Sequence, residues 1–465
     1  MRKSCYSLHN VWTVKNHKKD IRNRRKKIWY DEDGNGSYYK RMQAYVQRNQ
    51  KNTQNLDDRI TKKKTGGRKM AQTEQKNQNV KKQFEELQSL LERAMALQTS
   101  MVLFEWDDET LAPKGAAEHT ARVIGSLSEQ YQEILASMRF KELLDVCQKA
   151  EKENAGVFDE VQSAILREAA EEQERLSCIP PEEYRAYAEL TARATGIWTR
   201  AREKNDFASF APVLKEIISY QKKFAAYRAK PGQKLYDVML DTYEKGFNME
   251  MLDPFFELMK GKIVPLLKES AERSKRVPDA FLSADYPEAA QAEAARFLAE
   301  YEGFDFDRGV RNTTHYQKRI DSSIFSVLHE TGHAIYEFGI RDDLTQTLVG
   351  QGTSMGMHEC QSRFFENIVG RSHAFWKPIY GKVAQMFGSP LTETSLEDFL
   401  AAVNRTVPGL IRTEADELSY PLHVLVRYEI EKMLIEEELE VEKLPQIWND
   451  KYEEYLGVRP STDRE

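Results

Sequence analysis

The sequence has few cysteines, and they lie far apart. It contains four, Cys5, Cys147, Cys178 and Cys360, and no two of them form a Cys-x-x-Cys pair. This scarcity argues against a disulfide framework and against a zinc site built from thiolates. We therefore expect free thiols in a reducing compartment.

The sequence also lacks long apolar runs. No stretch approaches the roughly 18 apolar residues that a membrane-spanning helix needs. No apolar segment follows the basic N-terminus as it would in a secretory signal. Together with the free thiols, these absences predict a soluble cytoplasmic protein that does not use a membrane.

The alternating pattern of β-strands is almost missing as well, apart from a short piece near residues 311–316. Instead, apolar residues recur at spacings of three and four with charged outer faces, as in "FDEVQSAILREAAEEQERL" and "FAPVLKEIISYQKKFAAYR". Breaks in this pattern fall at Pro180–Pro181, Pro231–Gly232 and Asn248. Because no flexible linker divides the pattern, we predict one large all-α domain over residues 70–465.

Charge separates the chain into two unlike parts. Residues 1–69 contain 20 Lys and Arg against 6 Asp and Glu, a net charge of +14, so the overall charge of −6 leaves −20 for the remainder. The basic part has little apolar periodicity, and its composition predicts a disordered extension. Two alternatives stay open: the extension is an arm that binds nucleic acid or another anionic surface, or Met70 is the start of the working protein.

One short motif carries most of the chemical information, "HETGH" at His329–His333. On a helix, its two imidazoles lie one turn apart on one face, about 5–6 Å apart at Cβ, so both can bind one metal ion. Glu330 is rotated by about 100° from His329. It can therefore lie beside a metal-bound water and take its proton, as in metalloproteases. The alternative is an ordinary helix that happens to carry two histidines.

The surroundings of the motif support the metal interpretation. Glu337 follows His333 by four residues, where it can form a hydrogen bond behind a metal ligand. We expect this helix to start at Asp321 or Ser322, either of which can cap it, and to end at Gly339.

A third metal ligand is expected in residues 356–376, because catalytic zinc typically takes three protein ligands and leaves one position for water. This segment has an apolar helical face and a polar stripe that consists of Glu359, Arg363, Glu366 and Asn367. The stripe follows His358 and contains few lysines, which favours an inward-facing stripe with Glu359 as the ligand. The alternative is an ordinary polar face that points to solvent. His358 next to it could support a ligand, stabilise an oxyanion or be an ordinary surface histidine.

A further polar set lies in residues 411–431, where Arg412, Tyr420, His423 and Arg427 project at roughly helical offsets. Arginine suits the forked recognition of a carboxylate, and tyrosine or histidine can donate a hydrogen bond to an oxyanion. The alternative is an amphipathic helix with surface salt bridges.

Taken in order, these segments resemble the carboxypeptidase Taq family of thermostable metallocarboxypeptidases. The resemblance rests on "HETGH", "HECQSRFFENIVGRSHAFW" and "IRTEADELSYPLHVLVRYEIE", together with "LFEWDDETLAPKGAAEHTARVIGSLS" and "LYDVMLDTYEKGF" earlier in the chain. It extends from about Met70 to the C-terminus. It implies an elongated all-helical fold with a deep active-site groove, usually in a homodimer.

The resemblance also implies the roles of the central residues. One divalent metal ion, Zn²⁺ with Co²⁺ or Mn²⁺ as alternatives, would be held by His329, His333 and Glu359. Glu330 would act as the general base and acid. The substrates would be peptides with a free C-terminus, from which single amino acids other than proline are removed with broad specificity.

For the substrate, the resemblance implies that Arg412 binds the terminal carboxylate. Tyr420 and His423 would contact the substrate or the transition state. Arg427 and His358 are further candidates for such contacts.

Two features depart from the family pattern. The family carries a His-Pro-Phe loop that is missing here, since residues 303–309 run directly into residues 310–316. The family also continues beyond "YLGVRPSTDRE" with a signature that contains Gln-Asp and Trp. Misplacement of a substrate by about 1 Å can cost 100-fold in rate, so these departures predict impaired positioning. The alternatives are thus a catalytically impaired protein that binds metal and peptide, and a helical oligopeptidase that cuts internal bonds.

Overall fold

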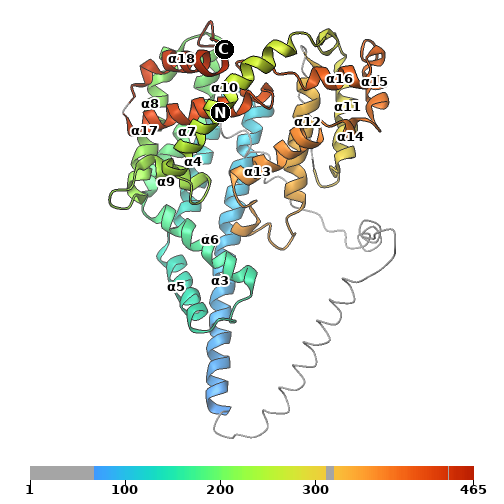
Figure 1. Cartoon of the computed structure of the whole chain (residues 1–465). Coiled ribbons are helices and arrows are strands. Elements are labelled where there is room, and N and C mark those ends of the chain that lie inside the picture. The colour runs from blue at the N-terminus through green and yellow to red at the C-terminus, as the bar shows by residue number, and fades with distance from the viewer. Residues whose placement is uncertain (1–66, 310–318, 438, 465) are drawn as a thin grey trace, which may run out of the picture.

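The structure is a computed structural model that describes residues 67–309, 319–437 and 439–464. Every regular element in these ranges is a helix, which confirms the all-α prediction (Figure 1). The predicted basic extension lies outside the described residues except for its last three, which begin the first described helix, and the strand expected near residues 311–316 lies outside them too. No described helix combines the length and the apolar character that a membrane span requires.

A 44-residue helix, α3, forms a long axis through the molecule (Figure 1). Helix α4 packs against both α3 and α7, and α5 packs against α3. The local starts follow capping rules: Ser137 caps α5, and Asp159 and Gln162 form a capping box at α6. The helices of this half are α3 (Gly67–Thr110), α4 (Ala117–Leu135), α5 (Met138–Glu153), α6 (Glu160–Ser177), α7 (Pro181–Glu203) and α8 (Phe207–Arg228).

The second half of the chain supplies two separate groups of helices. One group shares a hydrophobic cluster with α8 and consists of α9 (Leu235–Tyr243), α10 (Met249–Ser274), α17 (Tyr420–Glu436) and α18 (Leu444–Leu456). The other contains α11 (Glu288–Glu302), α12 (Ile320–Phe338), α14 (His373–Trp376), α15 (Tyr380–Phe387) and α16 (Leu396–Val403). Between α12 and α14 the chain forms α13 (Met355–Arg363) and a π-helical turn, η5 (Phe364–Val369).

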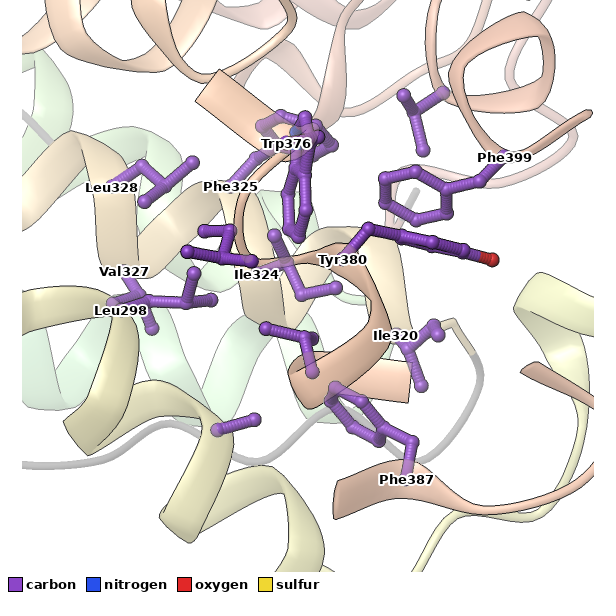
Figure 2. Packing of buried hydrophobic residues seen from close by; sticks show 14 of the residues in the cluster. Leu298, Ile320, Ile324, Phe325, Val327, Leu328, Trp376, Tyr380, Phe387 and Phe399 are labelled. Carbon is purple, nitrogen blue, oxygen red and sulfur yellow. The ribbon is translucent and has the colours of Figure 1, made fainter. Parts of the chain in front are cut away.

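The core of the second group holds α12 in place. Trp376 and Phe399 pack edge to face with their ring centroids 4.8 Å apart, and Ile324 and Leu328 of α12 lie in the same cluster (Figure 2). Full burial of such side chains contributes about 1.5–3 kcal/mol each. Helix α12 is therefore a firm support for the "HETGH" motif that it carries.

The start of α12 differs from the sequence prediction. The helix begins at Ile320, with Arg319 at the N-cap and no side-chain cap. Asp321 lies inside the first turn and accepts a hydrogen bond from the Arg319 guanidinium at 2.7 Å, so the expected cap by Asp321 or Ser322 is wrong. Its negative charge still suits the positive end of the helix dipole. The predicted end at Gly339 is confirmed.

Candidate metal centre

Two neighbouring helices bring the three expected ligands to one point. His329 and His333 lie one turn apart on α12, with ring centroids 4.9 Å apart. Glu359 faces them from α13, with its Oε2 atom 3.7 Å from Nε2 of His329 and 3.6 Å from Nε2 of His333. One ligand atom from each residue lies within 4.8 Å of the others. Two imidazoles and one carboxylate so arranged fit a divalent ion that takes nitrogen and oxygen ligands.

The close approach of α12 and α13 depends on Gly332, the glycine inside "HETGH". A Cβ atom at this position would lie 2.9 Å from Cα of Ser362 and 3.1 Å from the carbonyl oxygen of Gln361. Real Cβ atoms essentially never show the first of these distances, and the second is tighter than most real Cβ contacts. Any side chain at this position would therefore push the two helices, and the ligands on them, apart.

The imidazole of His329 is oriented by a buried carboxylate. Oε2 of Glu366 lies 2.9 Å from Nδ1 of His329 and also accepts a hydrogen bond from Nη1 of Arg363 at 2.7 Å. Burial raises the pKa of Glu366, but its hydrogen bond with His329 and the charges of Arg363 and Arg371 outweigh burial and lower it. An ionised Glu366 accepts a hydrogen bond from the N–H group at Nδ1, which leaves the lone pair on Nε2 for a metal.

The polar stripe of this segment faces inward, as the sequence predicted. The side chain of Glu366 is only 7% exposed, whereas Phe364 and Ile368 are 48% and 61% exposed. The stripe thus occupies the position that apolar side chains take in most helices. The π-helical turn η5 includes Glu366, and such turns occur frequently at functional sites.

The second imidazole is oriented through an intermediate histidine. Nδ1 of His333 lies 3.3 Å from Nδ1 of His358, whose Nε2 lies 2.7 Å from Oε1 of Glu337. When the N–H group at Nε2 of His358 donates a hydrogen bond to Glu337, Nδ1 of His358 accepts one from the N–H group at Nδ1 of His333. Nε2 of His333 is then left with a lone pair that points at Glu359. From the sequence we expected Glu337 to form a hydrogen bond with His333 itself. In the structure Glu337 instead contacts His358, and His358 contacts His333.

Glu359 is held by several donors besides the imidazoles. Its Oε1 atom accepts from the Tyr420 hydroxyl at 2.8 Å, and Oε2 accepts from the Ser362 hydroxyl at 3.2 Å. Burial raises the pKa of Glu359, but the hydrogen bond with His333, the charge of His329, the hydrogen bond from Tyr420 and the charge of Arg363 outweigh it. The pKa therefore lies far below its usual range, and the carboxylate is ionised.

Glu330 lies beside the three converging residues. It follows His329 on α12 and is half-buried. Among the described residues, its carboxylate has no hydrogen-bond or salt-bridge partner.

The structure brings two residues of the third segment to this centre. Arg412 lies in the short helix η7 (Arg412–Glu414), and Tyr420 begins α17. Nη1 of Arg412 donates to the Tyr420 hydroxyl at 2.8 Å. The guanidinium of Arg363 covers the Tyr420 ring, 3.4 Å from its centroid. Arg412 is therefore two hydrogen bonds away from Glu359.

The other two residues of that segment are placed elsewhere. His423 is completely buried, with Nδ1 2.9 Å from the Tyr452 hydroxyl. Arg427 donates to the carbonyl oxygen of His423 at 2.8 Å and lies over the ring of Trp448. These contacts join α17 to α18. In this conformation His423 has no surface with which to touch a peptide.

Three supporting residues had no role in the sequence analysis: Glu366 as the partner of His329, Arg363 as the cover of Tyr420, and Ser362 as a donor to Glu359. The inward polar stripe was a signal for the first two. Their partners could not be named, because α12 and α17 are far from this segment in the sequence.

Comparison with known proteins gives consistent matches along most of the chain. Residues 86–465 match the family model described as carboxypeptidase Taq (M32) metallopeptidase. A protein named carboxypeptidase 1 from Bacillus subtilis (strain 168) is 38% identical over 394 residues, which cover 81% of this chain and 78% of the relative. Thermostable carboxypeptidase 1 from Thermus thermophilus is 35% identical, with coverage of 80% and 78%. The crystal structure of BsuCP is 36% identical, superposes with a TM-score of 0.77 and covers 82% of this chain and 80% of that one.

Proposed function

The chain belongs to the carboxypeptidase Taq (M32) metallopeptidase family, and we propose on this basis that it is a metal-dependent carboxypeptidase that releases single C-terminal amino acids from peptides. One observation carries the proposal: three ligand atoms converge within 4.8 Å, and Arg412 is connected to them through Tyr420. A metal centre can activate water, and a guanidinium can recognise a terminal carboxylate. An enzyme that removes the last residue of a peptide needs both.

We assign the metal to His329, His333 and Glu359. Zinc is the proposed ion, because two histidines and one glutamate are a common ligand set of catalytic zinc; cobalt and manganese are the alternatives. When bound, such an ion polarises a carbonyl oxygen and lowers the pKa of a water molecule towards about 7. The proposed ligand roles are supported by the contacts at both Nδ1 atoms, which leave the Nε2 atoms to face Glu359.

The remaining steps are assigned to residues of the chain. Glu330 takes a proton from the attacking water and later delivers it to the leaving amine nitrogen. General acid–base catalysis of this kind contributes typically 10²–10⁴-fold to a rate. His423, which the sequence offered as a contact for the oxyanion, has no part in the proposed steps because it is completely buried.

Arg412 is proposed to select the exopeptidase reaction. Its guanidinium is planar and carries five N–H donors, of which one is directed at Tyr420. The others can form the forked pair that binds a carboxylate. The broad side-chain specificity, the exclusion of proline and the homodimer are parts of the proposal that rest on the family resemblance.

The decisive experiment is mass spectrometry of a mixed peptide pool incubated with the zinc-loaded protein. We expect a ladder of products that lose one residue at a time from the C-terminus. The Glu330→Gln variant should produce this ladder at least about 100-fold more slowly. If the variant trims peptides as fast as the wild type, Glu330 is not the base.

Two controls separate the rival functions. Peptides with a C-terminal amide should resist the carboxypeptidase, whereas an oligopeptidase that cuts internal bonds would cleave them. Metal analysis of the same sample identifies the third possibility, since bound zinc without any ladder would indicate a protein that binds metal and peptide but has lost catalysis.

A further inference from the structure

A continuous chain of hydrogen bonds joins the proposed carboxylate-binding residue to a proposed metal ligand. Arg412 donates through Nη1 to the Tyr420 hydroxyl at 2.8 Å, and the same hydroxyl donates to Oε1 of Glu359 at 2.8 Å. The other oxygen of Glu359 faces the two imidazoles. The two oxygens therefore have different partners: one is directed at the metal centre and the other at Tyr420.

Tyr420 is held firmly between these partners. The Arg363 guanidinium lies 3.4 Å from the centroid of its ring. Arg363 in turn forms a salt bridge at 2.7 Å with Glu366, the residue that orients His329. Displacement of Tyr420 would thus disturb the supports of two ligands at once.

The approach of Arg412 to Tyr420 is produced by a tight turn between η7 and α17. The carboxylate of Asp416 accepts hydrogen bonds from the backbone N–H groups of Leu418 and Ser419, and from the Ser419 hydroxyl at 2.7 Å. The turn brings two residues that are eight positions apart in the sequence into direct contact. The contact between Arg412 and Tyr420 is therefore fixed by the backbone conformation of this segment.

We propose that Tyr420 is a positioning residue that couples the binding of a substrate carboxylate at Arg412 to the binding of the metal at Glu359. The proposal rests on the function proposed above. Tyr420 acts through Glu359, so its effect is on the geometry and the charge of that ligand.

The sign of the coupling follows from the direction of the two hydrogen bonds, in which Arg412 donates to Tyr420 and Tyr420 donates to Glu359. A donated hydrogen bond from Arg412 polarises the Tyr420 hydroxyl and makes it a stronger donor to Glu359. A carboxylate that pairs with Arg412 neutralises the guanidinium and weakens this polarisation. Glu359 then keeps more negative charge for the metal, so carboxylate binding tightens metal binding. Because linkage is reciprocal, the metal tightens carboxylate binding by the same factor.

The test measures metal affinity and needs no turnover. Zinc affinity is determined by competition with a chelator in the Glu330→Gln background, with and without an N-acetylated dipeptide that ends in a D-residue. The same peptide as its C-terminal amide is the matched ligand control. We expect the acid to tighten zinc binding about tenfold and the amide to leave it unchanged.

Replacement of Tyr420 by phenylalanine removes the link while keeping the ring under Arg363. In Tyr420→Phe we expect the effect of the acid to fall below about twofold, against the tenfold coupling of the parent protein. Tyr227→Phe is the matched control, because the Tyr227 hydroxyl also donates to a carboxylate, Glu183, but at the exposed surface. It should retain the full effect. Equal tightening in Tyr420→Phe and in the parent protein would overturn the proposal.

A second variant and a spectroscopic measurement provide additional tests of the coupling. Arg412→Gln interrupts the series of hydrogen bonds at its other end. It should abolish the effect of the acid, even if Tyr420→Phe fails to fold. In the cobalt-loaded protein, the visible absorption should shift when the acid is added to the parent protein and stay constant in both variants. A C-terminal ladder from the wild type without any coupling would refute the role of Tyr420 and leave the carboxypeptidase standing. The loss of both zinc binding and the ladder would refute both.

Discussion

The chemistry of the site depends first on which ring nitrogen of His329 and of His333 carries the proton. Glu366 directs the proton of His329 to Nδ1, and the pair His358 and Glu337 does the same for His333. Each arrangement leaves a lone pair on Nε2, the atom that we propose binds the metal. Such supporting hydrogen bonds commonly change metal affinity by 10–100-fold. Residues that are not proposed ligands therefore favour the tautomer of each histidine in which Nε2 carries the lone pair.

His423 shows how burial controls the protonation of a histidine that the site does not use. Burial, together with the charges of Arg427 and Arg412, lowers the pKa of His423 to about 3. In the unfolded chain the group takes up a proton near its ordinary pKa of about 6.5. Stability contributed by the neutral form is thus complete above about pH 6.5 and is lost as the pH falls towards 3.

This difference predicts a pH dependence of folding. Between pH 6.5 and 5, the wild type should lose about 2 kcal/mol of unfolding free energy relative to His423→Gln, since one pKa unit corresponds to about 1.4 kcal/mol. Denaturant unfolding of both proteins at several pH values measures the difference. His119→Gln, at an exposed position of α4, should show no comparable trend relative to the wild type. Parallel curves for the wild type and His423→Gln would contradict the prediction.

Among the helices, the contact between α12 and α13 is the one on which the metal centre depends. The two proposed ligands of α12 and the one of α13 can meet only because Gly332 lets the backbones approach. The motif "HETGH" therefore carries a packing requirement as well as a chemical one. Sequence spacing indicates the histidines, but it gives no reason for the glycine between them.

We predict that Gly332→Ala weakens zinc binding at least tenfold, comparable to the loss of a supporting residue, and lowers the unfolding free energy by about 1–3 kcal/mol. The added methyl group would collide with the backbone of Ser362. Chelator competition and denaturant unfolding give the two quantities. Gly261→Ala on α10 is the control, because a Cβ at that position meets nothing within 4 Å; it should be neutral or stabilise the helix by up to about 1 kcal/mol. Wild-type zinc affinity in Gly332→Ala would exclude a role for the close approach.

At the level of the whole molecule, the site joins two hydrophobic clusters. Helix α12 belongs to the cluster around Trp376, and α17 belongs to the cluster that includes Tyr452. The hydrogen bond from Tyr420 to Glu359 and the contact of Arg363 with Tyr420 connect the two sides. A metal held at this point would therefore stabilise the arrangement of both groups of helices.

We expect removal of the metal to lower the melting temperature. A ligand present at 1,000 times its dissociation constant stabilises the folded state by about 4 kcal/mol, which for a domain of this size corresponds to roughly 5 °C. Thermal melts with and without a chelator measure the shift. The double variant His329→Ala/His333→Ala should melt at the same temperature in both conditions. A chelator effect of equal size in that variant would show that the stabilising ion binds elsewhere.

The all-α fold and the histidine pair were accessible from the sequence, because both follow from local geometry. A spacing of three and four apolar residues indicates a helix wherever it occurs, and helical rise places His329 and His333 on one face. The starting point of α12 was missed for an equally local reason: Asp321 is a good cap in isolation, but here it pairs with Arg319 inside the first turn.

The environment of the ligands depended instead on long-range packing. Glu366 lies 37 positions from His329, and Tyr420 lies 61 positions from Glu359, so no spacing rule could pair them. The same packing turned His423 inward against Tyr452 while Arg412, eleven positions earlier, reached the centre. The helices and the pairing of two histidines on one helical face can be predicted from the sequence, because they depend on neighbours within a turn or two. Which polar side chains share a buried point depends on how distant helices pack, since burial and hydrogen bonding are properties of the assembled fold.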